Sequence, residues 1–212
     1  MRIAPSRRIT SPFSMSFSNY AIANDPPPSY QRHSQMNRIE IEIKLSKDRA
    51  WLLDTISQLS PEDLVRGATK SEHNPDNMWS AKDHLVHLAG IEKNFVLMIR
   101  RHLAGNPNPV ALRSNPDGTE RTMEEIMATV HEMTERWVVE HRTKSLSEAV
   151  ALGQQARSET LALMAELSDD QLAEKLPGAP WSDGTIGGVI SVSADHGRVH
   201  WQWAKEGLGR AG

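Results

Sequence analysis

The sequence predicts an all-α protein built as a pseudo-symmetric four-helix bundle, with an extra short helix and a disordered N-terminal tail. The first observation is a set of long segments in which apolar residues recur every three or four positions, as on the buried face of a helix. The second is an internal echo, in which residues 59–64 (LSPEDL) resemble residues 167–172 (LSDDQL). Each copy precedes a loop, then Trp-Ser, then a segment with histidines. Two matching helix–loop–helix halves predict one bundle.

Length and composition limit the classes of protein to which the chain can belong. The chain has 212 residues, a formal net charge of −3, a pI near 6.3 and no cysteine. One domain is the default at this length. The lack of cysteine excludes disulfides, Fe–S clusters, Cys-ligated zinc and a Cys nucleophile. Without a dominant basic stripe we expect no nucleic-acid partner. No run approaches the roughly 18 apolar residues of a membrane-spanning helix, so we expect no membrane partner and a cytoplasmic protein.

The first 37 residues differ from the rest. Residues 1–35 hold four arginines against one acid, Asp25, a balance of +3 that leaves −6 for the remainder. Three consecutive prolines, residues 26–28, break any helix. This composition suits a disordered tail, an organelle transit peptide, or a start assigned too early with Met36 as the true start. We therefore expect residues 1–37 to be a disordered or misassigned extension and residues 38–212 to form the bundle domain.

The predicted bundle domain begins with a segment of mixed character. Residues 38–45 (RIEIEIKL) alternate apolar and charged side chains, which indicates a short strand or an extended lead-in. Ser46 then suits the N-cap of a helix that runs to about Leu59. Residues 60–63 (SPED) combine a capping Ser, a Pro at the first helical position and acids in the first turn, which predicts a short helix. Residues 66–78 read as a loop.

Four longer helices are predicted after this loop. Ser80 and Asp83 form an approximate capping box for a helix that runs to about Leu103, where Gly, Asn and Pro stop it. Residues 104–121 form a loop of a length that is often functional. Helices follow over residues 122–141, from Ser147 to about residue 167, and over residues 186–205, each with apolar residues at helical spacing.

Histidines mark two of these helices. At about 100° per residue, His196 and His200 fall on the apolar face of the last helix. A buried pair four residues apart is either a hydrogen-bonded feature of the core or half of a metal site. The helix that starts after Ser80 carries His84 and His87, and bundle symmetry places it beside the last helix. Three imidazoles with an open position are typical of a catalytic zinc site, and nickel or iron also accept imidazole. Helical angle alone slightly prefers His84 over His87.

From about residue 46 to residue 208 the chain resembles the DinB/YfiT-like superfamily of four-helix-bundle metalloenzymes. The matching segments are residues 79–89 (WSAKDHLVHLA), residues 185–190 (TIGGVI) and the HxxxH pair formed by His196 and His200. In that family a metal-binding histidine lies eight residues after the Trp, a position that His87 holds here. The resemblance implies a metal site made of His87, His196 and His200, with His84 as the second choice. The long 104–121 loop and the N-terminal extension depart from the family pattern.

Carboxylates near these histidines are candidates for supporting roles. Glu92 falls within the apolar arc of its helix, where a carboxylate is costly unless it is paired. It could orient a ligand, act as an acid or base, or form a surface salt bridge. Asp83 and Asp195 are expected to be exposed acids. The HxxxH pair has Gly197 where zinc proteases carry their general-base Glu, which excludes that mechanism.

The resemblance implies a divalent-metal-dependent hydrolase, or a transferase or isomerase that uses a low-molecular-weight thiol such as bacillithiol or mycothiol. Because the chain has no cysteine, such a thiol must be a small cofactor. A small-molecule substrate is expected, and a homodimer is a habit of the family. Two alternatives remain. One is a non-catalytic binding or sequestering protein of the stress response on the same bundle, and the other is a structural bundle whose histidines satisfy the core.

Overall fold

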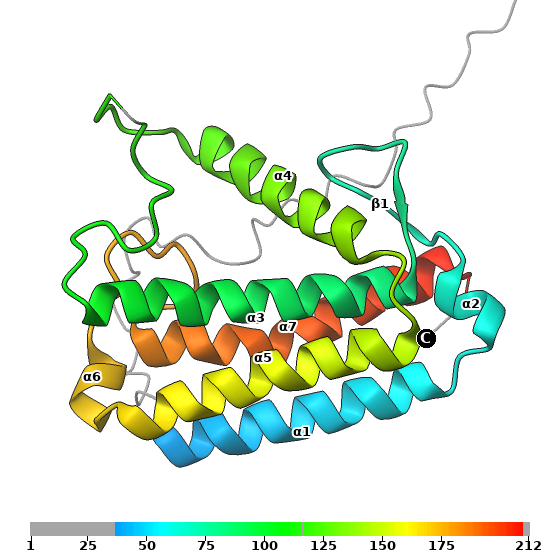
Figure 1. Ribbon diagram of the computed structural model, residues 1–212, viewed down its shortest axis with the longest axis horizontal. Coiled ribbons are helices and arrows are strands. Elements are labelled where there is room, and N and C mark those ends of the chain that lie inside the picture. Colours follow the sequence, from blue (N-terminus) through cyan, green and yellow to red (C-terminus); the bar gives the residue numbers. More distant parts are fainter. Residues whose placement is uncertain (1–36, 116, 210–212) are drawn as a thin grey trace, which may run out of the picture. The chain divides into compact units, whose positions relative to one another are not determined.

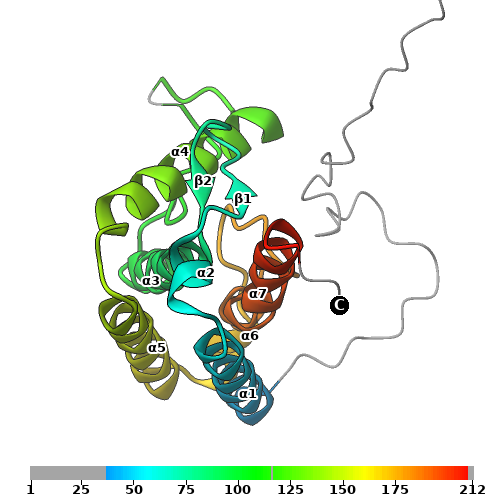
Figure 2. The same cartoon turned by 90° about the vertical axis from the view of Figure 1, so that its right-hand side faces the viewer.

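The computed structural model describes residues 37–115 and 117–209, and the core of this part is a ring of four long helices. The four are α1 (Arg38–Ser57), α3 (Ala81–Leu103), α5 (Leu146–Glu166) and α7 (Ile186–Gly207). Each packs against two of the others, as the end-on view in Figure 2 shows. The predicted all-α four-helix bundle is therefore confirmed (Figure 1). The predicted N-terminal tail lies outside the described residues up to position 36.

The first helix corrects one prediction. The alternating segment 38–45 is not a strand or a lead-in, because α1 begins at Arg38 with Asn37 and Glu40 forming its capping box. Ser46 is therefore an interior residue and not an N-cap. Ile41 and Leu45 are fully buried at helical spacing, whereas Ile39 is 65% exposed and Ile43 is 48% exposed. The alternating pattern thus contained one buried pair four residues apart and two isoleucines that face outward.

Both copies of the internal echo adopt the same local structure. Ser60 caps α2 (Pro61–Val65), and Ser168 caps α6 (Asp169–Ala173). After α2 the chain forms an antiparallel pair of β1 (Thr69–Lys70) and β2 (Met78–Trp79), and all but Trp79 of this pair lies in the segment 66–78 that was predicted as a loop. After α6 a single antiparallel bridge joins Lys175 and Thr185. In each half, a short helix and a strand-like contact therefore lead into a histidine-bearing helix.

One helix lies outside the ring. α4 (Met123–His141) packs on α3, on the side away from α1 (Figure 2). The indole Nε1 of Trp137 donates a hydrogen bond of 2.8 Å to the carbonyl of Val86. Gly90 makes this approach possible, since a Cβ there would lie 2.6 Å from Trp137 Nε1. The absence of a side chain at position 90 therefore fixes the contact between α4 and the bundle.

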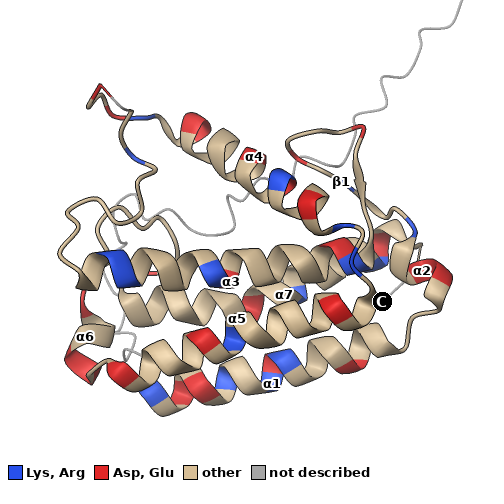
Figure 3. Cartoon of the chain, viewed as in Figure 1, with Lys and Arg blue, Asp and Glu red and all other residues tan. Residues whose placement is uncertain are grey.

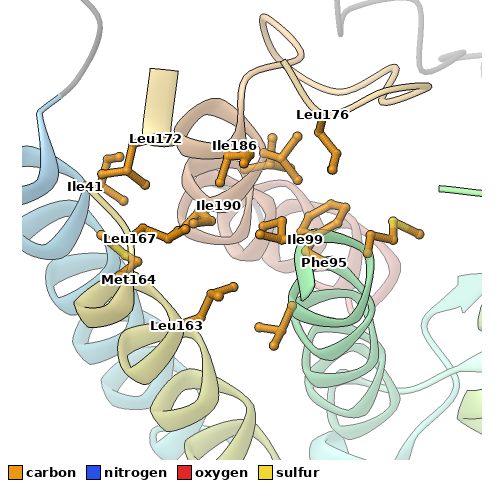
Figure 4. Packing of buried hydrophobic residues seen from close by; sticks show 14 of the residues in the cluster. Ile41, Phe95, Ile99, Leu163, Met164, Leu167, Leu172, Leu176, Ile186 and Ile190 are labelled. Carbon is orange, nitrogen blue, oxygen red and sulfur yellow. The ribbon is translucent and has the colours of Figure 1, made fainter. Parts of the chain in front are cut away.

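The bundle interior has two apolar clusters, with a layer of charged residues between them along the helices. Figure 4 shows labelled side chains of the larger cluster pointing toward one another. Its labelled members are Ile41, Phe95, Ile99, Leu163, Met164, Leu167, Leu172, Leu176, Ile186 and Ile190. The smaller cluster contains Leu52, Ile56, Leu59, Leu64, Ala81, Leu85, Leu88, Ala204 and Leu208. The charged residues between them, called the polar layer below, are Asp48, Arg49, Glu92 and Arg157.

Charged side chains of both signs cover the outer faces of the helices. Figure 3 shows Lys and Arg interspersed with Asp and Glu along the bundle. Exposed pairs such as Arg100–Glu166, at 2.8 Å, join neighbouring helices. Within the described ranges, no helix is both long and apolar enough to cross a membrane.

Candidate metal centre

Four histidines from two helices are buried together beside the smaller apolar cluster. His84 and His87 lie near the start of α3, and His196 and His200 lie in the second half of α7. Their exposed fractions are 3–7%. The spacings of three and four residues place each pair on one helix face, and α3 packs directly on α7. We call these four residues the histidine cluster.

Three members of the cluster converge through their Nε2 atoms. The Nε2 of His196 lies 3.1 Å from the Nε2 of His200 and 3.4 Å from the Nε2 of His87. His87, His196 and His200 each offer one ligand atom, and these atoms lie within 4.8 Å of one another. In a tetrahedral zinc site with Zn–N distances near 2.05 Å, two ligand nitrogens are about 3.3 Å apart. The two measured separations therefore fit two edges of such a tetrahedron.

His84 lies outside this converging group and contacts its far side. Its Nδ1 faces the Nδ1 of His200 at 2.8 Å, and its Nε2 faces the hydroxyl of Thr69 at 3.0 Å. Thr69 belongs to β1, inside the segment that the sequence indicated was a loop. No local signal in the sequence marks it as a neighbour of the site, because the contact depends on how β1 folds back over the start of α3.

Two tryptophans pack against the imidazole rings. The Trp79 ring lies 5.5 Å from the ring of His84 and 5.1 Å from that of His87, between centroids. The Trp203 ring meets His200 edge to face at 4.8 Å. Trp79 is itself held by its Nε1, which donates a 2.8 Å hydrogen bond to the buried carboxylate of Glu135 on α4. Helix α4 therefore holds Trp79, and with it one side of the histidine cluster, in place.

Burial keeps the imidazoles neutral. It lowers the pKa of His84 to about 3 and that of His196 to about 4, with the nearby His196 ring lowering the His84 value further. Burial, together with the neighbouring histidines, also lowers the pKa values of His87 and His200 well below the ordinary 6.5. Neutral imidazole is the form that binds metals, so near pH 7 no proton must be removed from a charged ring before binding. The Nδ1 of His87 has no hydrogen-bond partner among the described residues.

Glu92 is buried, so the surface salt bridge considered from the sequence is wrong. Its side chain belongs to the polar layer, and the residue is 2% exposed. One carboxylate oxygen accepts a 3.0 Å hydrogen bond from Arg49 Nη2, and the other accepts one of 2.5 Å from Arg157 Nε. Two guanidinium groups thus occupy both oxygens, which favours a structural role. The alternative role as an acid or base stays a prediction.

The two aspartates differ from each other. The expectation that Asp83 is exposed is wrong, because Asp83 is 3% exposed and pairs with Arg142 at 3.4 Å. Its Oδ2 accepts a 2.9 Å hydrogen bond from the backbone N–H of Ser80, which completes the predicted capping box. Asp195 is exposed, as expected, and pairs with Lys44 at 2.5 Å. The cap position of Asp83 could have indicated its burial, since it sits one turn before a buried histidine.

Comparison with known proteins finds one family and two similar structures. The family model described as the DinB superfamily matches residues 70–204. The crystal structure of an uncharacterised protein from Escherichia coli UTI89 superposes with a TM-score of 0.59 at 17% identity, over 82% of this chain and 96% of that one. The crystal structure of the colibactin self-resistance protein ClbS in complex with a dsDNA gives 0.61 at 12% identity, over 83% and 98%. No curated protein sequence matches this chain.

The second structure corrects the expectation of no nucleic-acid partner. A protein of this fold has been crystallised with double-stranded DNA. The expectation was drawn from net charge and from the lack of a basic stripe in the sequence. Net charge describes the whole chain, whereas contacts with phosphates are made by local groups. The charge balance therefore does not exclude nucleic acid.

Proposed function

The chain belongs to the DinB superfamily, and from this membership and the three converging histidines we propose that it is a divalent-metal-dependent enzyme. His87, His196 and His200 would hold the ion. One observation carries the proposal: three Nε2 atoms from two helices point at one place, with separations of 3.1 and 3.4 Å. These separations also match the distance of about 3.3 Å between two nitrogen ligands of a tetrahedral zinc ion. Zinc, nickel and ferrous iron all accept this donor set.

The chain's own groups prepare this site for chemistry. Burial keeps all four rings neutral, so the ligand nitrogens are available without loss of a proton. Among the described residues the group contains no fourth His, Asp or Glu ligand, which suits a catalytic centre with a position open to substrate. Trp79 packs an apolar ring against His87, and Trp203 packs one against His200. A divalent ion held by these residues would polarise a bound group and lower the pKa of a water or thiol ligand.

Two reaction classes fit this chemistry. Hydrolysis would use water in the open position, and thiol-linked transfer or isomerisation would use a low-molecular-weight thiol there. The thiol cannot come from the chain itself, because the sequence has no cysteine. The reacting partner in either class is a small molecule. We therefore propose a hydrolase or a transferase that depends on a small thiol.

The second candidate is a binding protein without turnover. It is favoured by ClbS, a self-resistance protein of the same fold whose structure contains dsDNA. In this role the bundle would sequester a small molecule or hold double-stranded DNA. The −6 balance of the chain after residue 35 means that DNA binding would need a local cluster of basic residues.

The test is turnover by metal-loaded protein. Wild type and His196→Ala, each supplied with Zn²⁺, Ni²⁺ or Fe²⁺, would be assayed on activated esters and on an electrophile with bacillithiol or mycothiol. His102→Ala is the matched control, since His102 is on α3 but pairs with Glu174 away from the cluster. The proposal predicts many products per chain for wild type and His102→Ala, and none for His196→Ala. Depletion of one free substrate molecule per chain without any product would support the binding role. Titration of the same preparations with labelled dsDNA would distinguish DNA binding from small-molecule binding.

A further inference from the structure

We propose that His84 and Thr69 form an outer hydrogen-bond chain that positions His200 as a metal ligand. This inference rests on the proposed function, since it assigns roles around the same site. His84 would be a positioning residue that acts through His200, and Thr69 would fix the orientation of the His84 ring. The inference also gives a role to the fourth histidine of the cluster, which does not converge with the other three.

The chain of contacts runs from the ligand outward. The Nδ1 of His200 lies 2.8 Å from the Nδ1 of His84, and the Nε2 of His84 lies 3.0 Å from the Thr69 hydroxyl. Both distances are within the range of a hydrogen bond with a nitrogen donor. His84 and His200 are each 3% exposed, so water does not replace either partner at low cost.

Proton positions in this chain are fixed once His200 serves as a ligand. Its Nε2 lone pair is then in use, so the ring proton sits on Nδ1 and donates to the Nδ1 of His84. The Nδ1 of His84 is then an acceptor, and its own proton must sit on Nε2. That proton points at Thr69 Oγ1, which accepts it. Every contact has one donor and one acceptor in this arrangement, and the His200 ring is held in the tautomer that coordinates through Nε2.

The pairing of β1 with β2 keeps this hydrogen-bond chain in place. Thr69 is the register partner of Trp79 in the pairing of β1 with β2. The Trp79 ring packs edge to face on His84, with 5.5 Å between centroids. Glu135 accepts the indole N–H of Trp79 and so anchors the far side of the ring. One strand pair therefore supplies both the hydrogen bond to His84 and the surface against which its ring is packed.

The proposed ligands differ in whether their Nδ1 atom has a hydrogen-bond partner. His87 has no hydrogen-bond partner for its Nδ1 among the described residues. His200 has a partner that is itself partnered. Outer partners that orient ligating histidines typically change metal affinity by about 10- to 100-fold when they are removed. Loss of His84 should therefore weaken binding through His200 without abolishing it.

The experiment measures metal affinity, and not activity, in four variants. His84→Leu removes both ring nitrogens, and His84→Asn retains an acceptor oxygen near the position of Nδ1. Thr69→Val removes the hydroxyl with little change of shape. Thr160→Val is the matched control, since the buried Thr160 hydroxyl donates to Ala156 within α5. Zn²⁺ affinity would be measured by competition with a chelator, and ligand geometry by the visible absorption of bound Co²⁺.

We expect His84→Leu to bind Zn²⁺ about 10- to 100-fold more weakly than wild type and to alter the Co²⁺ spectrum. His84→Asn should recover most of the affinity, Thr69→Val should lose a smaller part, and Thr160→Val should match wild type. Wild-type affinity and an unchanged Co²⁺ spectrum in His84→Leu would overturn the inference and leave the metal site standing. If wild type itself binds neither ion, the proposed function fails and this inference fails with it. Should His84→Leu not fold, a Thr69→Val protein with the affinity and spectrum of wild type would overturn it.

Discussion

Replacing Glu92 by glutamine removes the central negative charge of the polar layer and should destabilise the bundle severely. Glu92 is the acid that both Arg49 and Arg157 contact, and each arginine side chain is less than 15% exposed. The amide of glutamine keeps one acceptor oxygen and turns an NH₂ group toward one arginine. Two buried cations then lose their counter-charge. Burial already lowers the pKa of Arg49 against the raising effect of Glu92, so the charge of Arg49 is maintained against a desolvation cost.

The expected size of this loss follows from burial. Removing one partner of a buried ion pair costs about 3–5 kcal/mol, because the remaining charge is left uncompensated. For a domain with a stability of about 5–15 kcal/mol, this is a large fraction of the total. Glu166→Gln is the matched control, since Glu166 also bonds an arginine through both oxygens at 2.8 Å but on the surface. An exposed pair such as this one contributes little to stability, because both charged groups remain solvated when the pair is broken.

The assay is urea unfolding followed by circular dichroism, with Zn²⁺ affinity measured on the same preparations. We expect a large fall in the unfolding free energy for Glu92→Gln, little change for Glu166→Gln, and wild-type affinity in both folded proteins. A Glu92→Gln protein within about 1 kcal/mol of wild type would refute the structural reading of the polar layer. If stability were kept but metal affinity lost, Glu92 would instead be a group that supports the histidine ligands.

Three further predictions concern titration, packing and helix register. In metal-free protein the unfolding free energy should fall as the pH drops from about 6.5 toward about 4, by about 1.4 kcal/mol per pH unit for each histidine that is protonated only when unfolded. The sign follows because burial lowers the folded-state pKa to about 3 for His84 and about 4 for His196; equal urea midpoints at pH 7 and pH 5 would contradict it. Gly90→Ala should cost about 1–3 kcal/mol by overpacking against Trp137, and Gly90→Ala/Trp137→Leu should cost less than the sum of the single changes in a double-mutant cycle. Ile41→Ala should cost about 2–5 kcal/mol and Ile39→Ala under about 0.5, whereas equal losses would contradict the helical register of α1.

Sequence reasoning was strongest where one periodic signal extended over several turns. The helices α3, α4, α5 and α7 follow from apolar spacing, and the caps at Ser60 and Ser80 follow from local chemistry. The prediction for residues 38–45 was wrong. In this segment apolar and charged residues alternate, as in a strand, and two apolar residues also lie four positions apart, as on one face of a helix. Only the tertiary structure shows which isoleucines are buried, because the choice depends on which face α1 presents to α7.

The candidate site was harder to derive because it depends on rotation of the helices. Helical angle alone slightly favoured His84 over His87, and the family pattern favoured His87. The structure brings both histidines to α7. The Nε2 of His87 faces the Nε2 of His196, and the Nδ1 of His84 faces the Nδ1 of His200. A rotation error of a fraction of a turn is enough to exchange these roles. Thr69 and Glu135 could not be found from sequence, since each contact joins two different elements of the fold: β1 and α3 for Thr69, and β2 and α4 for Glu135.

The most direct test of the proposed metal centre is the metal content per chain of protein purified without a His tag. Elemental analysis would be run on wild type, on His196→Ala/His200→Ala and on the control His102→Ala, before and after incubation with Zn²⁺ and dialysis. We expect about one divalent ion per chain in wild type and in the control, and none in the double variant, because a single imidazole does not hold the ion. Wild type that keeps no metal after loading, or a double variant that keeps as much as wild type, would contradict it.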